Sequence, residues 1–277
     1  MTRTNAPTQL VFQRDGKLLQ HKTSVVAVLS INDLSEGNRS VFKQAVPDKD
    51  FIVITKETIF HPQGGGQPTD EGHMALDGSS CNFQVTNVRM DVDASSSGQV
   101  LHLGQFLDPS QPQFKPGDVV EQVVDAEKRL LYSRLHTAGH VLGAAVRHLL
   151  EKEIEGFDEL KASHFPDSAA CEFQGSIDGK WKAPIQERLN EYIMRGVPVE
   201  IDFWTEDDFR REGLERLIPD RSLLAPGEDK FRVVKLAGLE TYPCGGTHVD
   251  TSDLCGDTSV KKISRSKGTS RVSYSVK

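Results

Sequence analysis

Up to about residue 120, apolar residues come in short runs that are separated by turn-forming residues. Residues 25–31 and 51–58 are rich in apolar and β-branched side chains, and residues 81–88 partly alternate apolar with polar positions. Many short strands with few helical windows are typical of a small barrel or sandwich. We therefore predict a β-rich, barrel-like domain over residues 1–120. The Pro- and Gln-rich residues 109–117 are either an interdomain linker or a long hairpin connection.

From Asp125 onward, the apolar residues change to the period of a helix. Leu131, Leu135 and Leu142 recur at helical spacing, and Asp125 is a suitable N-cap. These positions predict one long helix over residues 126–150.

Two further helices and several strands are predicted in the second half. One helix begins at Pro184 and stops at Gly196, and another follows the N-cap Thr205 and continues to about Leu217. Strands are expected around residues 172–174, 197–204, 231–236 and 260–274. The pattern predicts an α+β domain over residues 121–277, with helices packed on an antiparallel sheet.

The composition fits a globular chain of two domains. Of 277 residues, 37% are hydrophobic and 26% are charged, which argues against disorder. The net charge of −7, from 33 basic and 40 acidic residues, excludes phosphate binding driven by bulk charge but allows a local basic patch. No run approaches the ~20 apolar residues that cross a membrane, and no secretory signal is visible. We expect a cytoplasmic protein without a membrane partner, whose four cysteines are reduced thiols or metal ligands.

Two pairs of residues are candidates for metal binding. His136 and His140 are four apart on the predicted helix, so both imidazoles point to the same side and can bind one ion. The alternative is a chance spacing on a half-exposed helix. Cys244 and His248 are also four apart and enclose two glycines, which suits a tight loop around an ion. Together the pairs offer zinc three imidazole nitrogens and one thiolate sulfur.

A glycine-rich motif lies in the predicted first domain. Gly64, Gly65 and Gly66 stand in succession, and Gln67 and Asp70 follow them. Three consecutive glycines cost conformational entropy and make sense where a backbone approaches a ligand closely; a flexible turn is the alternative. The motif is not a P-loop, because no Gly-Lys-Ser/Thr follows it.

Three motifs in order give the chain a specific resemblance. They are Gly-Gly-Gly-Gln-Pro-Thr-Asp-Glu-Gly from Gly64, Arg-Leu-His-Thr-Ala-Gly-His-Val-Leu from Arg134, and Cys-Gly-Gly-Thr-His-Val from Cys244. In this order they resemble the editing domain of alanyl-tRNA synthetase. Because no aminoacylation domain precedes them, the chain resembles the free-standing, AlaX-type editing proteins, from about residue 24 to Tyr274. In two departures, Gln63 replaces a frequent glutamate, and Gly139 should weaken the zinc helix by up to ~1 kcal/mol relative to alanine.

The resemblance implies a hydrolase that removes a wrong amino acid from the 3′ end of alanine tRNA. The wrong amino acid is chiefly serine and, in some members of the family, glycine. A synthetase pocket for alanine excludes smaller glycine poorly and rejects serine poorly, so a second, cleaving site restores accuracy. The implied partner is the acceptor end of tRNA(Ala) that carries the wrong amino acid.

The resemblance also implies roles for the candidate residues. One zinc ion per chain would be bound by His136, His140, Cys244 and His248, which form the catalytic centre together with His164. Substrate contacts would come from Gly64, Gly65, Gly66, Gln67, Asp70 and Thr137. Thr137 points about 100° away from His136 around the helix, so packing is its alternative role. For His164 the alternative is a polar surface role.

Four protein ligands raise a difficulty for catalysis. They close a tetrahedral zinc, whereas hydrolytic zinc usually keeps one position open for water or substrate. Either one ligand is loosely held, or the ion becomes five-coordinate, or zinc mainly organises the site. We favour an ion that positions the substrate's amino group or terminal ribose beside an attacking water, with His248 or Cys244 loosely held.

Two other functions compete with this one. A zinc-stabilised module without activity would bind tRNA but would not turn it over. An unrelated metallohydrolase is disfavoured, because residues 137–139 (Thr-Ala-Gly) provide no glutamate base between the histidines.

Residues 261–277 contain six basic and no acidic side chains. The basic side chains would either contact acceptor-stem phosphates or protect an edge strand. We expect the protein to be a monomer.

Overall fold

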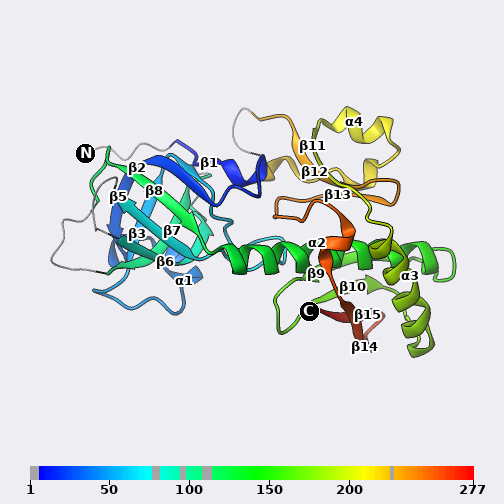
Figure 1. The fold of residues 1–277 in the computed structure, drawn as a ribbon. Coiled ribbons are helices and arrows are strands. Elements are labelled where there is room, and N and C mark those ends of the chain that lie inside the picture. Colours follow the sequence, from blue (N-terminus) through cyan, green and yellow to red (C-terminus); the bar gives the residue numbers. More distant parts are fainter. Residues whose placement is uncertain (1–5, 77–81, 94–97, 108–113, 225–227) are drawn as a thin grey trace. The chain divides into compact units, whose positions relative to one another are not determined.

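The computed structural model describes residues 6–76, 82–93, 98–107, 114–224 and 228–277 (Figure 1). Contacts within the chain divide it into two compact units. Unit 1 comprises Met1–Gly64 and Thr69–Arg129, and unit 2 comprises Gly65–Pro68 and Leu130–Lys277. The glycine-rich motif is therefore shared: its central residues, Gly65–Pro68, belong to unit 2.

Unit 1 contains a closed antiparallel barrel with the strand order β2-β3-β7-β6-β5-β8. These strands are β2 (Gln20–Ser30), β3 (Phe51–Thr55), β5 (Gly72–Leu76), β6 (Asn82–Met90), β7 (Val100–Phe106) and β8 (Val119–Val124). The short elements β1 (Gln9–Leu10), α1 (Glu36–Val41) and β4 (Glu57–Thr58) complete the unit. Val53, Met74, Phe83 and Val120 are fully buried and belong to one hydrophobic core, as expected for a small barrel filled by side chains. The predicted barrel-like fold is confirmed.

Two details of unit 1 differ from the prediction. The strand expected over residues 51–58 ends at Thr55, and β4 pairs with β1 in a separate two-stranded sheet. The segment 109–117 connects β7 and β8, which pair with other strands and not with each other. Because both strands belong to unit 1, the segment is neither an interdomain linker nor a hairpin connection. Its residues 109–113 lie outside the described residues.

The long helix α2 (Ala126–Leu150) has the predicted bounds. The carboxylate of Asp125 caps its first turn, because Oδ1 accepts hydrogen bonds from the backbone N–H groups of Glu127 and Lys128 at 3.1 and 3.0 Å. Nearly every side chain of residues 133–147 is buried. A helix buried all round must be covered on more than one face.

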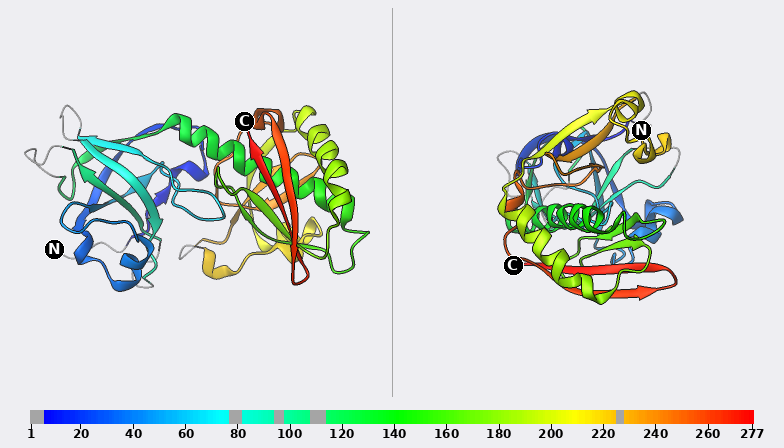
Figure 2. Two further views of the ribbon diagram at one scale, coloured as in Figure 1. Left: turned by 90° about the horizontal axis from the view of Figure 1, so that it is seen from below. Right: turned by 90° about the vertical axis from the view of Figure 1, so that its right-hand side faces the viewer.

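Two antiparallel sheets provide this cover in unit 2. Their orders are β14-β15-β10-β9 and β11-β12-β13, and Figures 1 and 2 show α2 lying between them. The strands are β9 (Asp158–Ser163), β10 (Ala170–Gln174), β11 (Val199–Trp204), β12 (Phe231–Leu236), β13 (Glu240–Pro243), β14 (Thr258–Ser266) and β15 (Thr269–Val276). The α+β class is confirmed, but the strands form two sheets where one was predicted.

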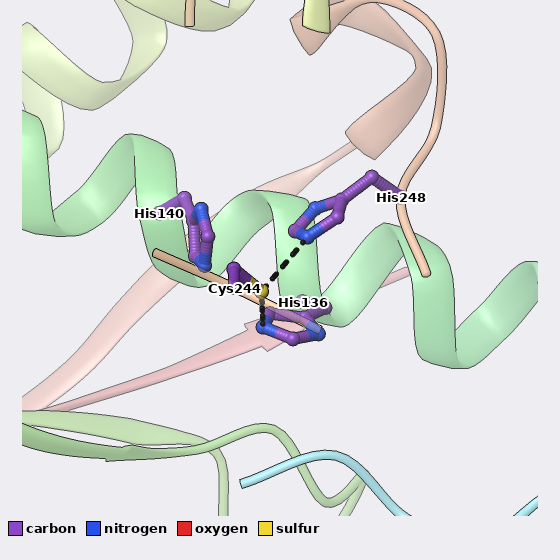
Figure 3. A group of neighbouring side chains, drawn as sticks. All are labelled: His136, His140, Cys244 and His248. Carbon is purple, nitrogen blue, oxygen red and sulfur yellow. Dashed lines mark hydrogen bonds between the residues drawn. The ribbon is translucent and has the colours of Figure 1, made fainter. Parts of the chain in front are cut away.

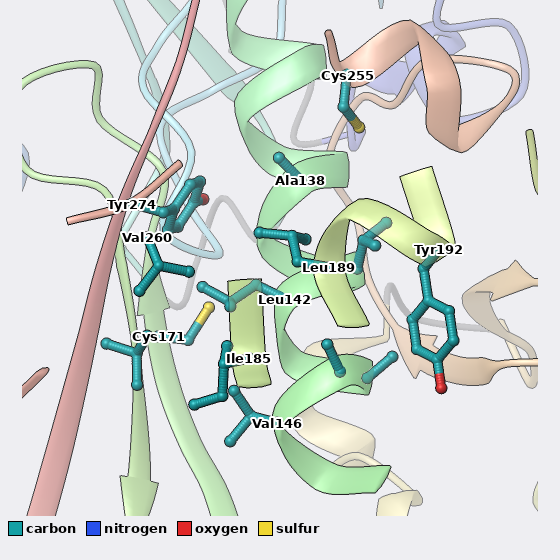
Figure 4. Packing of buried hydrophobic residues seen from close by; sticks show 14 of the residues in the cluster. Ala138, Leu142, Val146, Cys171, Ile185, Leu189, Tyr192, Cys255, Val260 and Tyr274 are labelled. Carbon is teal, nitrogen blue, oxygen red and sulfur yellow. The ribbon is translucent and has the colours of Figure 1, made fainter. Parts of the chain in front are cut away.

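The two shorter helices of unit 2 are α3 (Lys182–Met194) and α4 (Glu206–Arg211). The core shown in Figure 4 joins Leu142 of α2 to Leu189 of α3 and to Val260 of β14. The predicted N-cap Thr205 is confirmed, because its hydroxyl accepts from the N–H of Asp208. However, α4 ends at Arg211 and not near Leu217, and Gly213 has a φ of 70°, which ends a helix. Across the described ranges, no helix has the length and apolar character that a membrane span requires.

Candidate metal centre and adjoining cavity

The four predicted ligands converge in unit 2 (Figure 3). His136 and His140 project from one face of α2, and Cys244 and His248 lie in the loop after β13. One donor atom from each residue lies within 4.8 Å of those of the other three. The Cys244 Sγ atom is 3.4 Å from Nε2 of His136 and 3.3 Å from Nε2 of His248.

The arrangement fits a zinc ion. Tetrahedral zinc, with Zn–S near ~2.3 Å and Zn–N near ~2.0 Å, holds sulfur and nitrogen ligands roughly 3.5 Å apart. Both S···N distances around Cys244 are close to this value. In addition, Nδ1 of His140 is buried and has no hydrogen-bond partner within the described part of the chain. The donor set and its spacing suit zinc.

Burial favours the uncharged forms of His140 and Cys244. Burial lowers the pKa of His140 well below its ordinary value, and the nearby His164 and Arg232 act in the same direction. Burial also raises the pKa of the Cys244 thiol, although the Gly246 N–H and the Arg232 guanidinium oppose this shift. Neutral imidazoles are the form that binds a metal.

Gln67 holds His136 in the orientation that a metal requires. Its Oε1 atom lies 2.7 Å from Nδ1 of His136 and accepts from the Thr247 N–H at 2.9 Å. Its Nε2 atom donates to the Thr247 hydroxyl at 2.9 Å. Because the amide oxygen can only accept, Nδ1 of His136 carries the proton, and Nε2 stays available. Gln67 is fully buried, so it acts through His136.

Thr137 has a similar relation to His248. Its Oγ1 atom lies 3.1 Å from Nδ1 of His248 and accepts from the Val249 N–H at 3.1 Å. Thr137 is fully buried and does not line the adjoining cavity. The structure therefore places this candidate substrate residue behind a ligand.

His164 stacks on the first ligand. The ring centroids of His136 and His164 are 4.2 Å apart and the ring planes are 24° apart. The Tyr274 hydroxyl donates to the Leu135 carbonyl at 2.8 Å and lies 2.7 Å from Nδ1 of His164. Since the hydroxyl proton is already used, Nδ1 of His164 is the donor, and its Nε2 remains an acceptor. Burial lowers the pKa of His164 to about 4, so the ring is neutral near pH 7.

Three glycines leave room for these imidazoles. A Cβ on Gly246 would lie 2.4 Å from Nδ1 of His136, and a Cβ on Gly139 would lie 2.6 Å from Nδ1 of His164. A Cβ on Gly66 would lie 2.4 Å from a backbone oxygen, and its φ is 80°. Any larger residue at these positions would displace the site.

A cavity of about 430 Å³ adjoins the four candidate ligands, which we call the metal group. His136, His140 and Cys244 line it together with Gly65 and His164. Most of the other side chains that line it are polar: Arg147, Asp158, Glu159, Lys161, Glu172, Arg216, Glu240 and Tyr242. The metal group is thus accessible to a small, polar ligand.

Two candidate residues of the glycine-rich motif belong to unit 1. A Cβ on Gly64 would have one neighbour within 4 Å, the Pro62 carbonyl oxygen at 3.8 Å. The Asp70 carboxylate is fully buried and accepts from Nε of Arg129 at 3.1 and 3.2 Å. It also accepts from the His61 N–H at 2.6 Å. These contacts give Asp70 a clear structural role within unit 1.

Sequence reasoning missed several residues around the site. Arg232 donates to the Cys244 carbonyl at 2.5 Å, and Tyr242 and Tyr274 flank His140 and His164. No spacing rule identifies them, because they come from strands. Cys171 and Cys255 are buried free thiols, as predicted, and burial raises the pKa of Cys255 to about 12. Cys81 lies outside the described residues.

Comparison with known proteins finds no matching family model. The chain is 26% identical to the alanyl-tRNA editing protein AlaX-M of Methanosarcina barkeri, with 84% of this chain and 91% of that protein covered. It is 27% identical to AlaX-L of Pyrococcus horikoshii, with 82% and 52% covered. It is 28% identical to the alanine–tRNA ligase of Carboxydothermus hydrogenoformans, with 86% and 25% covered. The chain thus spans about a quarter of that ligase and half of AlaX-L, and the resemblance predicted from the motifs is confirmed.

Proposed function

We propose, from the resemblance to AlaX-type editing proteins, that this chain hydrolyses the ester between a wrong amino acid and the 3′-terminal adenosine of alanine tRNA. The observation that carries the proposal is the convergence of His136, His140, Cys244 and His248 beside a cavity. The volume of this cavity, about 430 Å³, is in the lower range of ligand sites and suits an aminoacyl group joined to a ribose.

The four ligands would hold one zinc ion, which supplies positive charge beside the substrate's ester, amino group or ribose. Gln67 would keep His136 in the tautomer that presents Nε2, and Thr137 would hold the ring of His248 in place. Such partners behind metal ligands are typically worth 10–100-fold in metal affinity or activity.

His164 would orient the attacking water. Its Nε2 is an acceptor because Nδ1 donates to Tyr274, and the residue lines the cavity. The water oxygen adds to the ester carbonyl carbon, the bond from that carbon to the ribose 3′-oxygen breaks, and the 3′-oxygen takes a proton. The amino acid leaves as a carboxylic acid, which ionises in water.

The tRNA backbone would meet basic side chains of β14 and the following turn. Lys261, Lys262 and Lys267 are exposed. In contrast, Arg265 lies 3.6 Å from Asp178 and Arg271 lies 3.1 Å from Glu172, which reduces their availability. Because β14 is the edge strand of its sheet, these lysines also protect that edge from pairing with another chain.

Deacylation assays test the proposed function. Seryl-, glycyl- and alanyl-tRNA(Ala) are incubated with the wild-type protein and with Cys244→Ala. We expect release of serine or glycine, slow release of alanine, and loss of activity in the variant. Binding of all three tRNAs without turnover would instead establish an inactive tRNA-binding module.

A further inference from the structure

The hydroxyl of Tyr242 is held loosely at the cavity wall. It donates to the His140 carbonyl at 3.3 Å and to Oε1 of Glu159 at 3.5 Å. Good O–H···O hydrogen bonds are near 2.7–2.8 Å, and one proton serves one acceptor at a time. The hydroxyl of Tyr274, in contrast, has contacts of 2.7 and 2.8 Å. Tyr242 can therefore exchange its weak contacts for a ligand hydroxyl at little cost.

A glycine on α2 makes space for the Tyr242 hydroxyl and the Glu159 carboxylate, which form a polar pair. A Cβ on Gly143 would lie 3.0 Å from the Tyr242 hydroxyl and 2.8 Å from Oε2 of Glu159. Gly143 follows His140 by about one helical turn, so the space lies on the side of α2 that carries the ligand histidines. Arg147, one further turn along, donates from Nε to Oε1 of Glu159 at 3.0 Å and fixes the carboxylate.

The pair lies within reach of an amino acid side chain. The ring of Tyr242 is 4.4 Å from that of His140, between centroids, and both residues line the cavity with Glu159. In a seryl ester, the hydroxyl oxygen is three bonds from the carbonyl carbon, or roughly 3–4 Å. A carbonyl held beside the ligand histidines would thus put the serine hydroxyl within reach of Tyr242.

We infer that the Tyr242 hydroxyl, supported by the Glu159 carboxylate, binds the side-chain hydroxyl of the wrongly attached amino acid and makes this site selective for seryl esters. The inference rests on the proposed function and names the residue that would distinguish a seryl ester from an alanyl or glycyl ester. An alanyl or glycyl ester offers no hydroxyl and leaves the polar pair without that partner. Sites built to bind a substrate hydroxyl discriminate strongly against analogues that lack it.

Tyr242→Phe tests the inference, because it removes only the hydroxyl. The probes are non-hydrolysable 3′-aminoacylamino-3′-deoxyadenosines that carry serine, alanine or glycine, titrated into the zinc-loaded protein by calorimetry. The wild type should bind the seryl probe at least tenfold more tightly than the alanyl probe. Tyr242→Phe should reduce this ratio to about one, with the alanyl and glycyl affinities unchanged.

Tyr192→Phe is the matched control. Its hydroxyl bonds Nδ1 of His148 at 2.7 Å, and Tyr192 does not line the cavity. This variant should keep the wild-type ratio. If Tyr242→Phe does not fold, Glu159→Gln provides the test and should lower the seryl-to-alanyl ratio by about threefold or more.

A wild-type seryl-to-alanyl ratio near one, or a high ratio that survives in the folded variants, would overturn the inference. Failure of the proposed function is a separate result. In that case, the wild type would release no amino acid from any of the three tRNAs, while the affinity ratios would still report on Tyr242.

Discussion

The Cβ that Gly139 lacks would lie 2.6 Å from Nδ1 of His164 and 2.7 Å from the hydroxyl of Tyr274. A Cβ atom does not approach a non-bonded atom so closely. Gly139 is therefore the point on α2 at which His164, directly after β9, and Tyr274 of β15 bring polar groups against the helix backbone. Glycine lowers the stability of the helix at this position, but it leaves the space that the His164 ring occupies.

Gly139→Ala should displace His164 from its stack on His136. We expect deacylation of the mischarged tRNA to fall by roughly 10²-fold, as misplacements of about 1 Å can cause. The control is Gly179→Ala, whose Cβ would have no neighbour within 4 Å. Equal activities of the two variants would contradict this role for Gly139.

Tyr274→Phe should allow both neutral tautomers of His164 while leaving the metal ligands in place. Without the Tyr274 oxygen, Nδ1 of His164 loses its acceptor at 2.7 Å. We expect kcat to fall about tenfold with little change in KM or zinc content. Imidazole ¹⁵N chemical shifts should show a mixture of tautomers. A single Nδ1–H tautomer in this variant would show that another group fixes the ring.

Asp70→Asn distinguishes a structural from a substrate-binding role. Asp70 is fully buried against Arg129, whose side chain is 4% exposed. Leaving one partner of a buried ion pair uncompensated costs about 3–5 kcal/mol of unfolding free energy. Glu71→Gln removes the partly exposed pair with Lys128 and should cost less than about 1 kcal/mol. Urea unfolding measures both; unchanged stability with a raised KM would favour substrate binding by Asp70.

His102 should make the barrel sensitive to acid. Burial lowers the pKa of His102 from 6.5 to about 4, while its bond to the Val53 carbonyl opposes this shift. Between these values the unfolded chain binds the proton and the folded chain does not. Stability is therefore complete above pH 6.5 and is lost as the pH falls toward 4, by up to about 3 kcal/mol. His102→Asn should show a smaller loss between pH 7 and pH 4.5 in urea unfolding, and equal losses would contradict this assignment.

Local signals predicted the elements that depend on neighbouring residues. Asp125 and the helical spacing of leucines located α2, and the apolar run from Phe231 located β12. The motif spacing also located the ligands, because His136 and His140 need only a helix to share a face.

The contacts that support the ligands could not be predicted in this way, even where the residue itself, such as Gln67, was a candidate. Gln67 and Thr247 are 180 positions apart, and only the folded chain brings the amide against His136. From the sequence alone Gly139 only weakens the helix, because the space it leaves for His164 depends on the folded chain. Tyr242 carries no motif of its own, and its place depends on the register of β13 against β12.

Titration of zinc into chelator-treated protein tests the central claim most directly. If His136, His140, Cys244 and His248 hold one ion at the reacting centre, seryl-tRNA(Ala) deacylation should rise linearly with added zinc. It should saturate at one equivalent per chain, and Cys244→Ala should show no such rise. Full activity of the metal-free protein, or no activity on any mischarged alanine tRNA at any zinc ratio, would contradict the account.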